Sequence, residues 1–333
     1  MTLPARFRAL YLERSGDGVA PRVGEVPASV LPEGEVLIRV SHSTVNYKDA
    51  MMVKGIGYRI ETFPFVPGID LAGTVEESAH PDFRPGDPVI LNGYGAGERF
   101  AGGYAAYARA RAQWLVPVPA GWGAADAMAV GTAGMTAMLS ILEFEKNGIA
   151  PASGEVLVTG AAGGLGSMAV AMLARLGYRV AASTGRAEAA DYLRGLGAGT
   201  VVPREELARG PDRPLMRRRW AACIDAVGGA TLATVISSLE ERGVIAACGL
   251  AGGNTVTASL IPFFLRGVRL IGIEGGHGPV AERREAWKRI PETLPREALA
   301  AMTTTAPLAD VPKLADAMLA GRVRGRVVID VDA

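Results

Sequence analysis

A glycine-rich turn lies between an apolar run and a helical pattern in residues 156–177, VLVTGAAGGLGSMAVAMLARLG. In such turns, glycines let the backbone approach a pyrophosphate, and the start of the following helix attracts its negative charge. Gly163 and Gly166 take the second and third glycine places of this pattern, whereas Ala161 stands where the first glycine is expected. An ordinary strand-to-helix turn is the alternative. Because the turn follows a predicted strand and opens a predicted helix, it indicates a dinucleotide-binding site.

The residues after the next predicted strand indicate which dinucleotide would bind. NAD sites commonly place a carboxylate there for the ribose hydroxyls, but this chain reads AASTGRAEAA, and Glu188 already belongs to the following helix. The hydroxyls of Ser183 and Thr184 and the guanidinium of Arg186 suit a 2′-phosphate, and Arg204 could close over it. Each arginine alone would be an ordinary surface charge. Together they predict NADPH.

A second group of polar residues lies in the sequence NYKD, which consists of Asn46, Tyr47, Lys48 and Asp49. Hydrogen-bond donors of this kind stabilise negative charge that develops on a carbonyl oxygen during a reaction. We therefore take these four as candidate catalytic residues. Plainer interpretations remain open: Tyr47 packs on a nicotinamide ring, Lys48 is solvated, and Asn46 and Asp49 cap the following helix.

The cysteines and histidines do not suggest a metal site. A zinc site needs four nitrogen, sulfur or oxygen ligands in a tetrahedral arrangement. The chain has two cysteines, Cys223 and Cys248, in apolar surroundings, and three scattered histidines, His42, His80 and His277. The sequence therefore predicts no metal, so that hydrogen-bond donors must polarise the substrate.

The sequence has two parts with different patterns of predicted secondary structure, which indicate two domains that would position these residues. Residues 1–123 contain short β-branched runs between turn signals, such as 35–45, 65–75 and 83–91, which is typical of a small β-barrel. Residues 124–276 alternate strands with helices: strands at 155–160, 178–184, 199–202, 220–228, 243–249 and 268–274, and helices at 164–177, 188–197 and 230–241. This alternation predicts a doubly wound parallel sheet, and hence an α/β protein. Residues 277–333 are helical at first and end in a strand, 325–331, that is expected to return to the first domain.

Composition narrows the function classes. The chain has 333 residues, 49% of them hydrophobic and 21% charged, with a net charge of +1. A chain of this length suits two domains, and its charge offers no field for nucleic acid or an anionic membrane. We expect a cytoplasmic protein without a secretion signal, since the N-terminus lacks an apolar segment and no apolar run reaches membrane-spanning length.

The motifs taken together resemble one family. TVNYKDAMMVKG, FPFVPGIDLAGTV, GGYAAYA, AMAVGTAGMTAML, VLVTGAAGGLGS, IDAVGG, CGLAGG and GRVVIDV resemble the medium-chain dehydrogenase/reductase superfamily. More narrowly, they resemble its zinc-free, quinone-oxidoreductase-like branch, which contains the bacterial NADPH-dependent acrylyl-CoA reductases. The resemblance implies a GroES-like barrel domain, a Rossmann domain, an active site in the cleft between them, and a homodimer joined through Rossmann edge strands at 268–274.

The resemblance also assigns roles to residues. It implies NADPH contacts at Tyr47, Ala161, Ala162, Gly163, Gly164, Ser183, Thr184, Gly185, Arg186, Arg204, Leu250, Phe264 and Gly275. The glycine pattern adds Gly166 to these residues. The segment 275–280, GGHGPV, departs from the family pattern and bears on the shape of an acyl pocket. Two further arginines, Arg324 and Arg326, are interpreted as surface residues rather than as contacts to an anionic ligand.

The implied reaction is the NADPH-dependent, metal-free reduction of the carbon–carbon double bond of a 2-enoyl thioester, with acryloyl-CoA as the leading substrate. A quinone or enone reductase is the closest alternative, since the same hydride delivery suits any polarised double bond. A protein of a different class, which binds NADPH with little turnover, is the third.

Overall fold

The computed structural model describes residues 3–333 and divides into two compact units. Unit 1 contains the chain up to Thr132 together with Gly276–Trp287 and Thr303–Ala333. Unit 2 contains Ala133–Gly275 and Lys288–Met302. The prediction of an α/β protein with a barrel-type domain and a parallel-sheet domain is confirmed.

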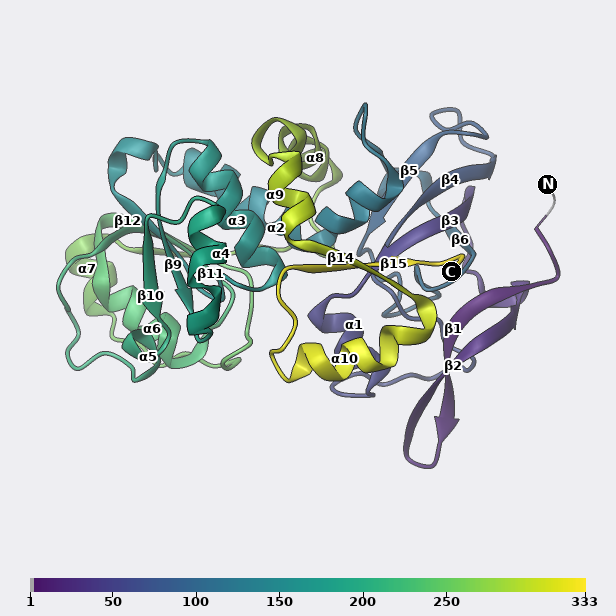
Figure 1. The fold of residues 1–333 in the computed structure, drawn as a ribbon, viewed down its shortest axis with the longest axis horizontal. Helices are drawn as coiled ribbons and strands as arrows, with labels where there is room; N and C mark the ends of the chain where they lie inside the picture. The colour runs from purple at the N-terminus through teal and green to yellow at the C-terminus, as the bar shows by residue number, and fades with distance from the viewer. Residues whose placement is uncertain (1–2) are drawn as a thin grey trace. The chain divides into compact units, whose positions relative to one another are not determined.

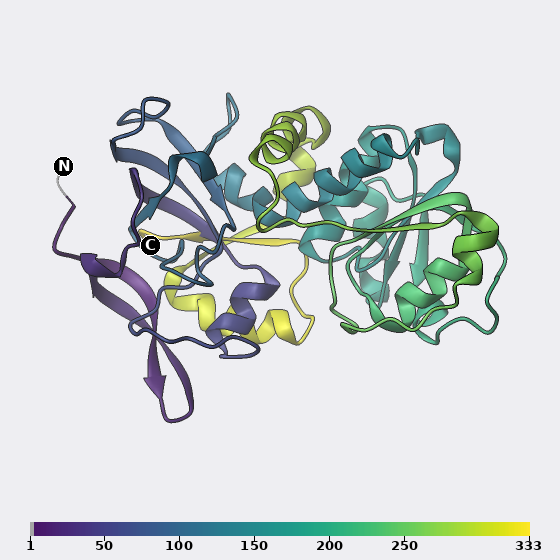
Figure 2. The same ribbon diagram turned by 180° about the vertical axis from the view of Figure 1, so that it is seen from behind.

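Unit 1 is built on a largely antiparallel sheet in which β3 (Val36–Thr44) is central. The strand order is β14-β15-β3-β4-β5-β7, and β6 also pairs with β3. Figures 1 and 2 show the last strand, β15, beside β3. The other elements of this unit are β1 (Arg6–Ser15), β2 (Gly18–Pro27), α1 (Tyr47–Val53), β4 (Asp70–Ser78), β5 (Pro88–Asn92), β6 (Tyr107–Ala110), β7 (Val116–Pro117), β14 (Thr303–Pro307), α10 (Val311–Leu319) and β15 (Arg326–Asp330).

The core of unit 1 follows from alternation along its strands. Val36, Ile38 and Val40 recur at every second position of β3 and are fully buried, as the period of two requires for one face of a strand. Leu308 and Val311, from near the end of the chain, join the same apolar cluster. Hydrophobic burial therefore draws the C-terminal segment into this unit.

Unit 2 is a six-stranded sheet in which every pair is parallel, in the order β10-β9-β8-β11-β12-β13. This is the doubly wound order expected for dinucleotide-binding domains. Every residue of β11 is buried, because helices cover both faces of the sheet. The elements are β8 (Glu155–Val158), α3 (Gly164–Arg175), β9 (Arg179–Thr184), α4 (Ala190–Gly195), β10 (Thr200–Pro203), α5 (Glu205–Ala208), β11 (Trp220–Asp225), α6 (Gly229–Ser238), β12 (Leu239–Ala247), α7 (Ile261–Arg266), β13 (Arg269–Gly272) and α9 (Arg296–Ala301).

One helix ends earlier than predicted. The expected helix at 230–241 stops at Ser238, and β12 begins at Leu239. The reason is Arg266, which is buried and donates hydrogen bonds from Nη1 to the carbonyls of Ser237 and Leu239, both at 2.9 Å. The first of these contacts satisfies the Ser237 carbonyl, which in a helix continued to residue 241 would accept from the N–H of that residue.

The division into units differs in two places from the boundaries expected at 123 and 276. Helix α2 (Ala124–Lys146) contains Gly131 with non-helical angles, φ 52° and ψ −160°, so that the part before this break belongs to unit 1. Helix α8 (Val280–Thr293) is shared between the units, and its later part joins unit 2, where Arg289 Nη2 donates to Glu145 at 2.9 Å.

Helix α2 also corrects one sequence expectation. Among the residues that the structure describes, it is the one helix long and apolar enough to cross a membrane, with a mean hydropathy of 1.4. The prediction that no apolar run reaches this length is therefore wrong. However, 78% of the most apolar 18-residue stretch of this helix is buried inside the protein, which is typical of a core helix.

Candidate functional site

The start of α1 carries the predicted catalytic residues and is held by Asp49. The Asp49 carboxylate accepts hydrogen bonds from the backbone N–H groups of Asn46 and Ile69, both at 2.8 Å. It also accepts one from the side-chain amide of Asn46 at 3.1 Å. Asp49 is thus a buried cap of the first turn, which was the plainer of its two interpretations.

Burial changes the acid strength of Asp49. Removal from water and, as a second cause, the nearby charge of Asp70 raise the pKa of this carboxyl from 3.8 to about 7. The backbone N–H groups of Ile69 and Asn46 oppose this effect without cancelling it. Asp49 therefore changes protonation near neutral pH.

The side chain of Asn46 is fully engaged within the protein. Its Nδ2 donates to Asp49 and to Asp70 Oδ2, the latter at 2.8 Å, and its Oδ1 accepts from Arg326 Nη1 at 3.0 Å. An amide nitrogen has two protons, so both are used. Asn46 consequently has no side-chain proton left to offer a substrate.

Arg326 is buried, so its interpretation as a surface residue is wrong. Only 3% of it is exposed, and its guanidinium also donates to Thr44 Oγ1 at 2.7 Å and to the carbonyl of Ala129 at 2.9 Å. The cause is that β15 lies between β14 and β3 within the sheet. The acceptors lie far from Arg326 in sequence, and for that reason local pattern gave no sign of them.

Tyr47 and Lys48 lie at the exposed side of α1. Tyr47 is 41% exposed, and among the described residues its hydroxyl has no hydrogen-bond partner. Lys48 Nζ lies 3.2 Å from Glu98 Oε1, which also accepts a hydrogen bond from the Tyr58 hydroxyl at 3.1 Å. Sequence reasoning missed Glu98, because it lies in a loop fifty residues along the chain. The Tyr47 hydroxyl is thus available to a ligand, whereas the Lys48 ammonium is ion-paired.

The glycine turn of unit 2 has the geometry of a dinucleotide loop, shifted by one residue. Gly160 takes the positive φ, 62°, that makes the tight turn, which explains why Ala161 is tolerated in the following place. At Gly166 a Cβ would lie 2.4 Å from the Gly160 carbonyl oxygen, so that only glycine lets helix α3 approach the strand. Helix α3 begins at Gly164, with Gly163 as its N-cap, which leaves N–H groups at its start for a phosphate.

The tip of β9 lies next to this turn. The backbone N–H of Ala161 donates to the Ser183 carbonyl at 3.0 Å. Beyond it, Arg204 N–H donates to the Thr184 carbonyl at 2.9 Å, and Arg186 N–H donates to Thr184 Oγ1 at 3.1 Å. The structure thus brings together the hydroxyls and both arginines predicted for a 2′-phosphate, at a strand end that carries no carboxylate.

The remaining predicted cofactor residues lie outside this cluster. Leu250 follows β12 and is 53% exposed, and Phe264 on α7 is 75% exposed. Gly275 is the last residue of the first segment of unit 2. Ala162, by contrast, is buried within the glycine turn. The role of Leu250, Phe264 and Gly275 in cofactor binding therefore stays a prediction.

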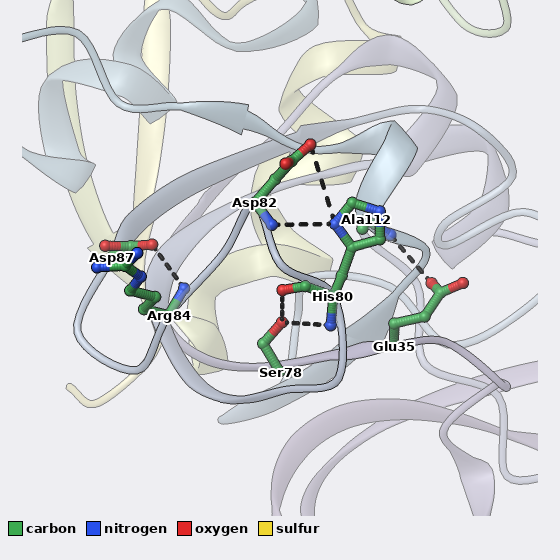
Figure 3. Close-up of polar contacts among 7 residues, drawn as sticks. All are labelled: Glu35, Ser78, His80, Asp82, Arg84, Asp87 and Ala112. Carbon is green, nitrogen blue, oxygen red and sulfur yellow. Dashed lines mark hydrogen bonds and ion pairs between the residues drawn. The ribbon is translucent and has the colours of Figure 1, made fainter.

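His80 makes local contacts, and both cysteines are free thiols. Figure 3 shows His80 in the connection between β4 and β5, where its Nδ1 accepts from the Asp82 N–H at 3.3 Å and Ser78 bonds to its backbone. Cys223 and Cys248 are free thiols. In residues 3–333, no three or more His, Cys, Asp or Glu side chains are grouped so as to hold a metal ion.

Comparison with known proteins adds to this geometry. Residues 32–120 match the family model described as "Alcohol dehydrogenase GroES-like domain", and residues 164–292 match "Zinc-binding dehydrogenase". The acrylyl-CoA reductase AcuI of Ruegeria pomeroyi is 49% identical over 98% of this chain and 100% of its own.

Two further relatives have solved structures. The yhdH oxidoreductase of Salmonella enterica, in complex with NADP, has a TM-score of 0.94 and 46% identity over 97% of this chain and 99% of its own. The putative quinone oxidoreductase YhfP of Bacillus subtilis is 41% identical over 97% of this chain and 98% of its own. Its structure with NAD bound has a TM-score of 0.93 and covers 98% of this chain and 100% of that one. All three relatives match along their whole length.

Proposed function

Because this chain belongs to the medium-chain dehydrogenase/reductase superfamily, we propose that it is an NADPH-dependent reductase that converts acryloyl-CoA to propanoyl-CoA. The observation that carries this proposal is the 49% identity with an acrylyl-CoA reductase over essentially both full chains. A quinone reductase is the second candidate, supported by the name of the Bacillus subtilis relative.

The cofactor assignment rests on the tip of β9. Arg204 and Arg186 lie at this strand end with the hydroxyls of Ser183 and Thr184, and no carboxylate is present there to hold the free ribose hydroxyl of NAD. Guanidinium groups match the paired oxygens of a phosphate. We assign the 2′-phosphate of NADPH to this cluster and the pyrophosphate to the turn at Gly160, Ala161, Ala162, Gly163, Gly164 and Gly166.

The proposed mechanism needs a donor at the thioester oxygen. When bound at these residues, NADPH would supply a hydride for the β-carbon of the enoyl thioester, and the α-carbon would take up a proton. Negative charge develops on the thioester oxygen, where one well-placed donor lowers the barrier by about 3 kcal/mol. We assign this role to the Tyr47 hydroxyl, which is exposed and has no hydrogen-bond partner among the described residues.

The other residues of NYKD support Tyr47. Asp49 caps the first turn of α1, and Asn46 ties that turn to Asp70 and Arg326. Lys48, on the same short helix, is held by its ion pair with Glu98. Since none of these groups needs a metal to act as a donor or a cap, we propose that turnover is independent of zinc.

We also propose a homodimer joined at β13. This strand is at the end of the sheet order, so one of its edges has no partner strand within residues 3–333. The nearby exposed apolar side chains are Leu260, Ile261, Phe264, Leu265 and Leu270. An open strand edge with apolar residues beside it favours pairing with another strand. The free thiols of Cys223 and Cys248 support a reducing, cytoplasmic setting.

A substrate panel tests the function. The quantity measured is kcat/KM for acryloyl-CoA, for a truncated acrylate thioester and for a simple quinone, each with NADPH and with NADH. We expect acryloyl-CoA with NADPH to be far ahead, because binding energy from the remote nucleotide of CoA can be used at the reacting carbon. A faster quinone would establish the second candidate. Absence of NADPH oxidation with every substrate would leave only a binding protein.

A further inference from the structure

A buried polar cluster in unit 1 connects segments that are distant in sequence. The Asp70 carboxylate is fully buried and accepts four hydrogen bonds. They come from Asn46 Nδ2 at 2.8 Å, Asn92 Nδ2 at 2.7 Å, Thr132 N–H at 2.8 Å and Thr132 Oγ1 at 2.5 Å. One carboxylate therefore joins the start of α1, the end of β5 and Thr132.

Arg326 contacts the same two key segments from β15. It donates to Thr44 Oγ1 and Asn46 Oδ1 just before α1, and to the carbonyl of Ala129 just before Thr132. The cation and the carboxylate thus each hold the start of α1 and the segment 129–132. Neither segment can shift without breaking hydrogen bonds to a buried charge, and loss of such hydrogen bonds has a large free-energy cost.

The segment 129–132 is special because the chain leaves unit 1 there. Thr132 is the last residue of the first segment of unit 1, and Gly131 directly before it has a positive φ. A Cβ at Gly131 would lie 2.8 Å from both Arg326 Nη2 and Asp70 Oδ2. The break in helix α2 is therefore fitted closely between the two charged groups.

Charged groups are a costly way to build a core. Replacing a buried ion pair with apolar residues of similar volume is often neutral or stabilising, so that stability alone does not account for this cluster. Hydrogen bonds to charged groups do fix direction and distance more tightly than apolar packing does. The cluster is therefore suited to holding the start of α1 and the segment 129–132 in a fixed position.

We propose that Asp70 and Arg326 are positioning residues of the reductase. They clamp the first turn of α1, which carries Tyr47, to the exit segment 129–132, and so fix the geometry in which Tyr47 meets the substrate. Neither residue touches the substrate in this role. The inference rests on the proposed function of Tyr47 and adds to it the part of the fold that holds the tyrosine in place.

Thr132 gives a mild test, because substitution of Asp70 itself would leave several buried donors without a partner. Thr132→Val removes one donor to Asp70 and keeps the backbone N–H contact, whereas Thr132→Ser keeps both. Thr74→Val is the matched control, since Thr74 lies exposed on the same strand as Asp70. We expect Thr132→Val to lower kcat about tenfold, which corresponds to about 1.4 kcal/mol of barrier, with the Kd for NADPH within about twofold of wild type. Thr132→Ser should restore kcat.

The decisive comparison is between Thr132→Val and the control. A kcat for Thr132→Val that equals that of Thr74→Val would overturn the proposal, even if the Tm falls, because the hydroxyl would then be structural only. If the wild type reduces neither acryloyl-CoA nor a quinone, the proposed function fails separately. Amide hydrogen exchange then decides on the clamp: faster exchange of 44–53 in Thr132→Val, but not in Thr132→Ser or the control, supports it, and unchanged exchange refutes it.

Discussion

The guanidinium of Arg204 lies across Gly185, with its Cζ 2.5 Å from the place that a Cβ at residue 185 would occupy. Only glycine at this strand tip leaves room for the arginine in that position. Because the colliding atoms belong to the end of a flexible side chain, a larger residue would displace Arg204 without disturbing the sheet. Gly185 therefore controls where this positive charge stands.

We predict that Gly185→Ala lowers NADPH affinity as removal of the arginine does. Arg204→Ala and Arg186→Ala should each weaken NADPH binding by about ten- to a hundredfold, since a charge-assisted hydrogen bond contributes roughly 1.5–3 kcal/mol. NADH binding should barely change. Titration of both cofactors by fluorescence measures this, with the exposed Arg194→Ala on α4 as the control. Equal losses for NADH and NADPH would show that the arginines act structurally.

Removal of one hydroxyl tests the proposed donor. Tyr47→Phe should lower kcat by about a hundredfold or more, because a donor to a developing oxyanion is lost. The Tm should stay unchanged, since the hydroxyl bonds no other described residue. Steady-state kinetics with Tyr11→Phe as a control checks this. A raised KM for NADPH at nearly unchanged kcat would instead assign the hydroxyl to cofactor binding.

The raised pKa of Asp49 predicts a dependence of stability on pH. Between the unfolded pKa of 3.8 and the folded pKa of about 7, the native state binds a proton that the unfolded state has released. The contribution of Asp49 to the free energy of unfolding is thus fully present below pH 3.8 and is lost as pH rises to about 7. The slope is about 1.4 kcal/mol per pH unit.

Urea unfolding between pH 5 and 8 measures this contribution. The charge of Asp70 acts on the pKa of Asp49, and the charge of Asp49 acts in turn on the pKa values of Tyr58, Tyr104 and Arg326. Asp49→Asn lacks the titrating proton. The free energy of unfolding of the wild type minus that of this variant should therefore fall as pH rises. Parallel curves for the two proteins would contradict the raised pKa.

Metal removal tests the proposed zinc independence. Dialysis against a strong chelator should leave kcat and KM for acryloyl-CoA unchanged, because the proposed donors are side chains of the protein. Metal analysis of the active enzyme before and after dialysis is the measurement. Stoichiometric zinc, together with activity that is lost on chelation and regained on zinc addition, would refute the mechanism.

Local patterns were sufficient to predict the parallel sheet and its nucleotide turn. The alternation of strands and helices predicts that the sheet of unit 2 is parallel and doubly wound, and the glycines predict where α3 begins, because both depend on neighbours within a few residues. The tight turn lies one residue earlier than the glycine pattern predicts, because Gly160 rather than residue 161 has the positive φ. The helix end at Ser238 was missed because it depends on Arg266.

The polar cluster of unit 1 could not be predicted in the same way. The arginine prediction failed at Arg326 because its environment is made by Asn46 and Thr44, more than 270 residues earlier in the chain. In the sequence, Asp70 follows Pro67-Gly68, and no local pattern marks it as the centre of a polar cluster. Its importance comes from four donors that only the folded sheet brings together. Lys48 likewise gained its partner, Glu98, from tertiary structure.

The pairing of β15 with β3 also has a consequence for the order of folding during synthesis. The strands of unit 2, from β8 to β13, lie within one continuous stretch of chain, so this sheet can form as soon as Gly272 has left the ribosome. The sheet of unit 1 must wait for Arg326–Asp330, which is made after every strand of unit 2. Until then, the edge of β3 at His42–Thr44 stays open and the Asp70 cluster lacks its arginine, so the first segment of unit 1 is incomplete while the sheet of unit 2 can already be folded.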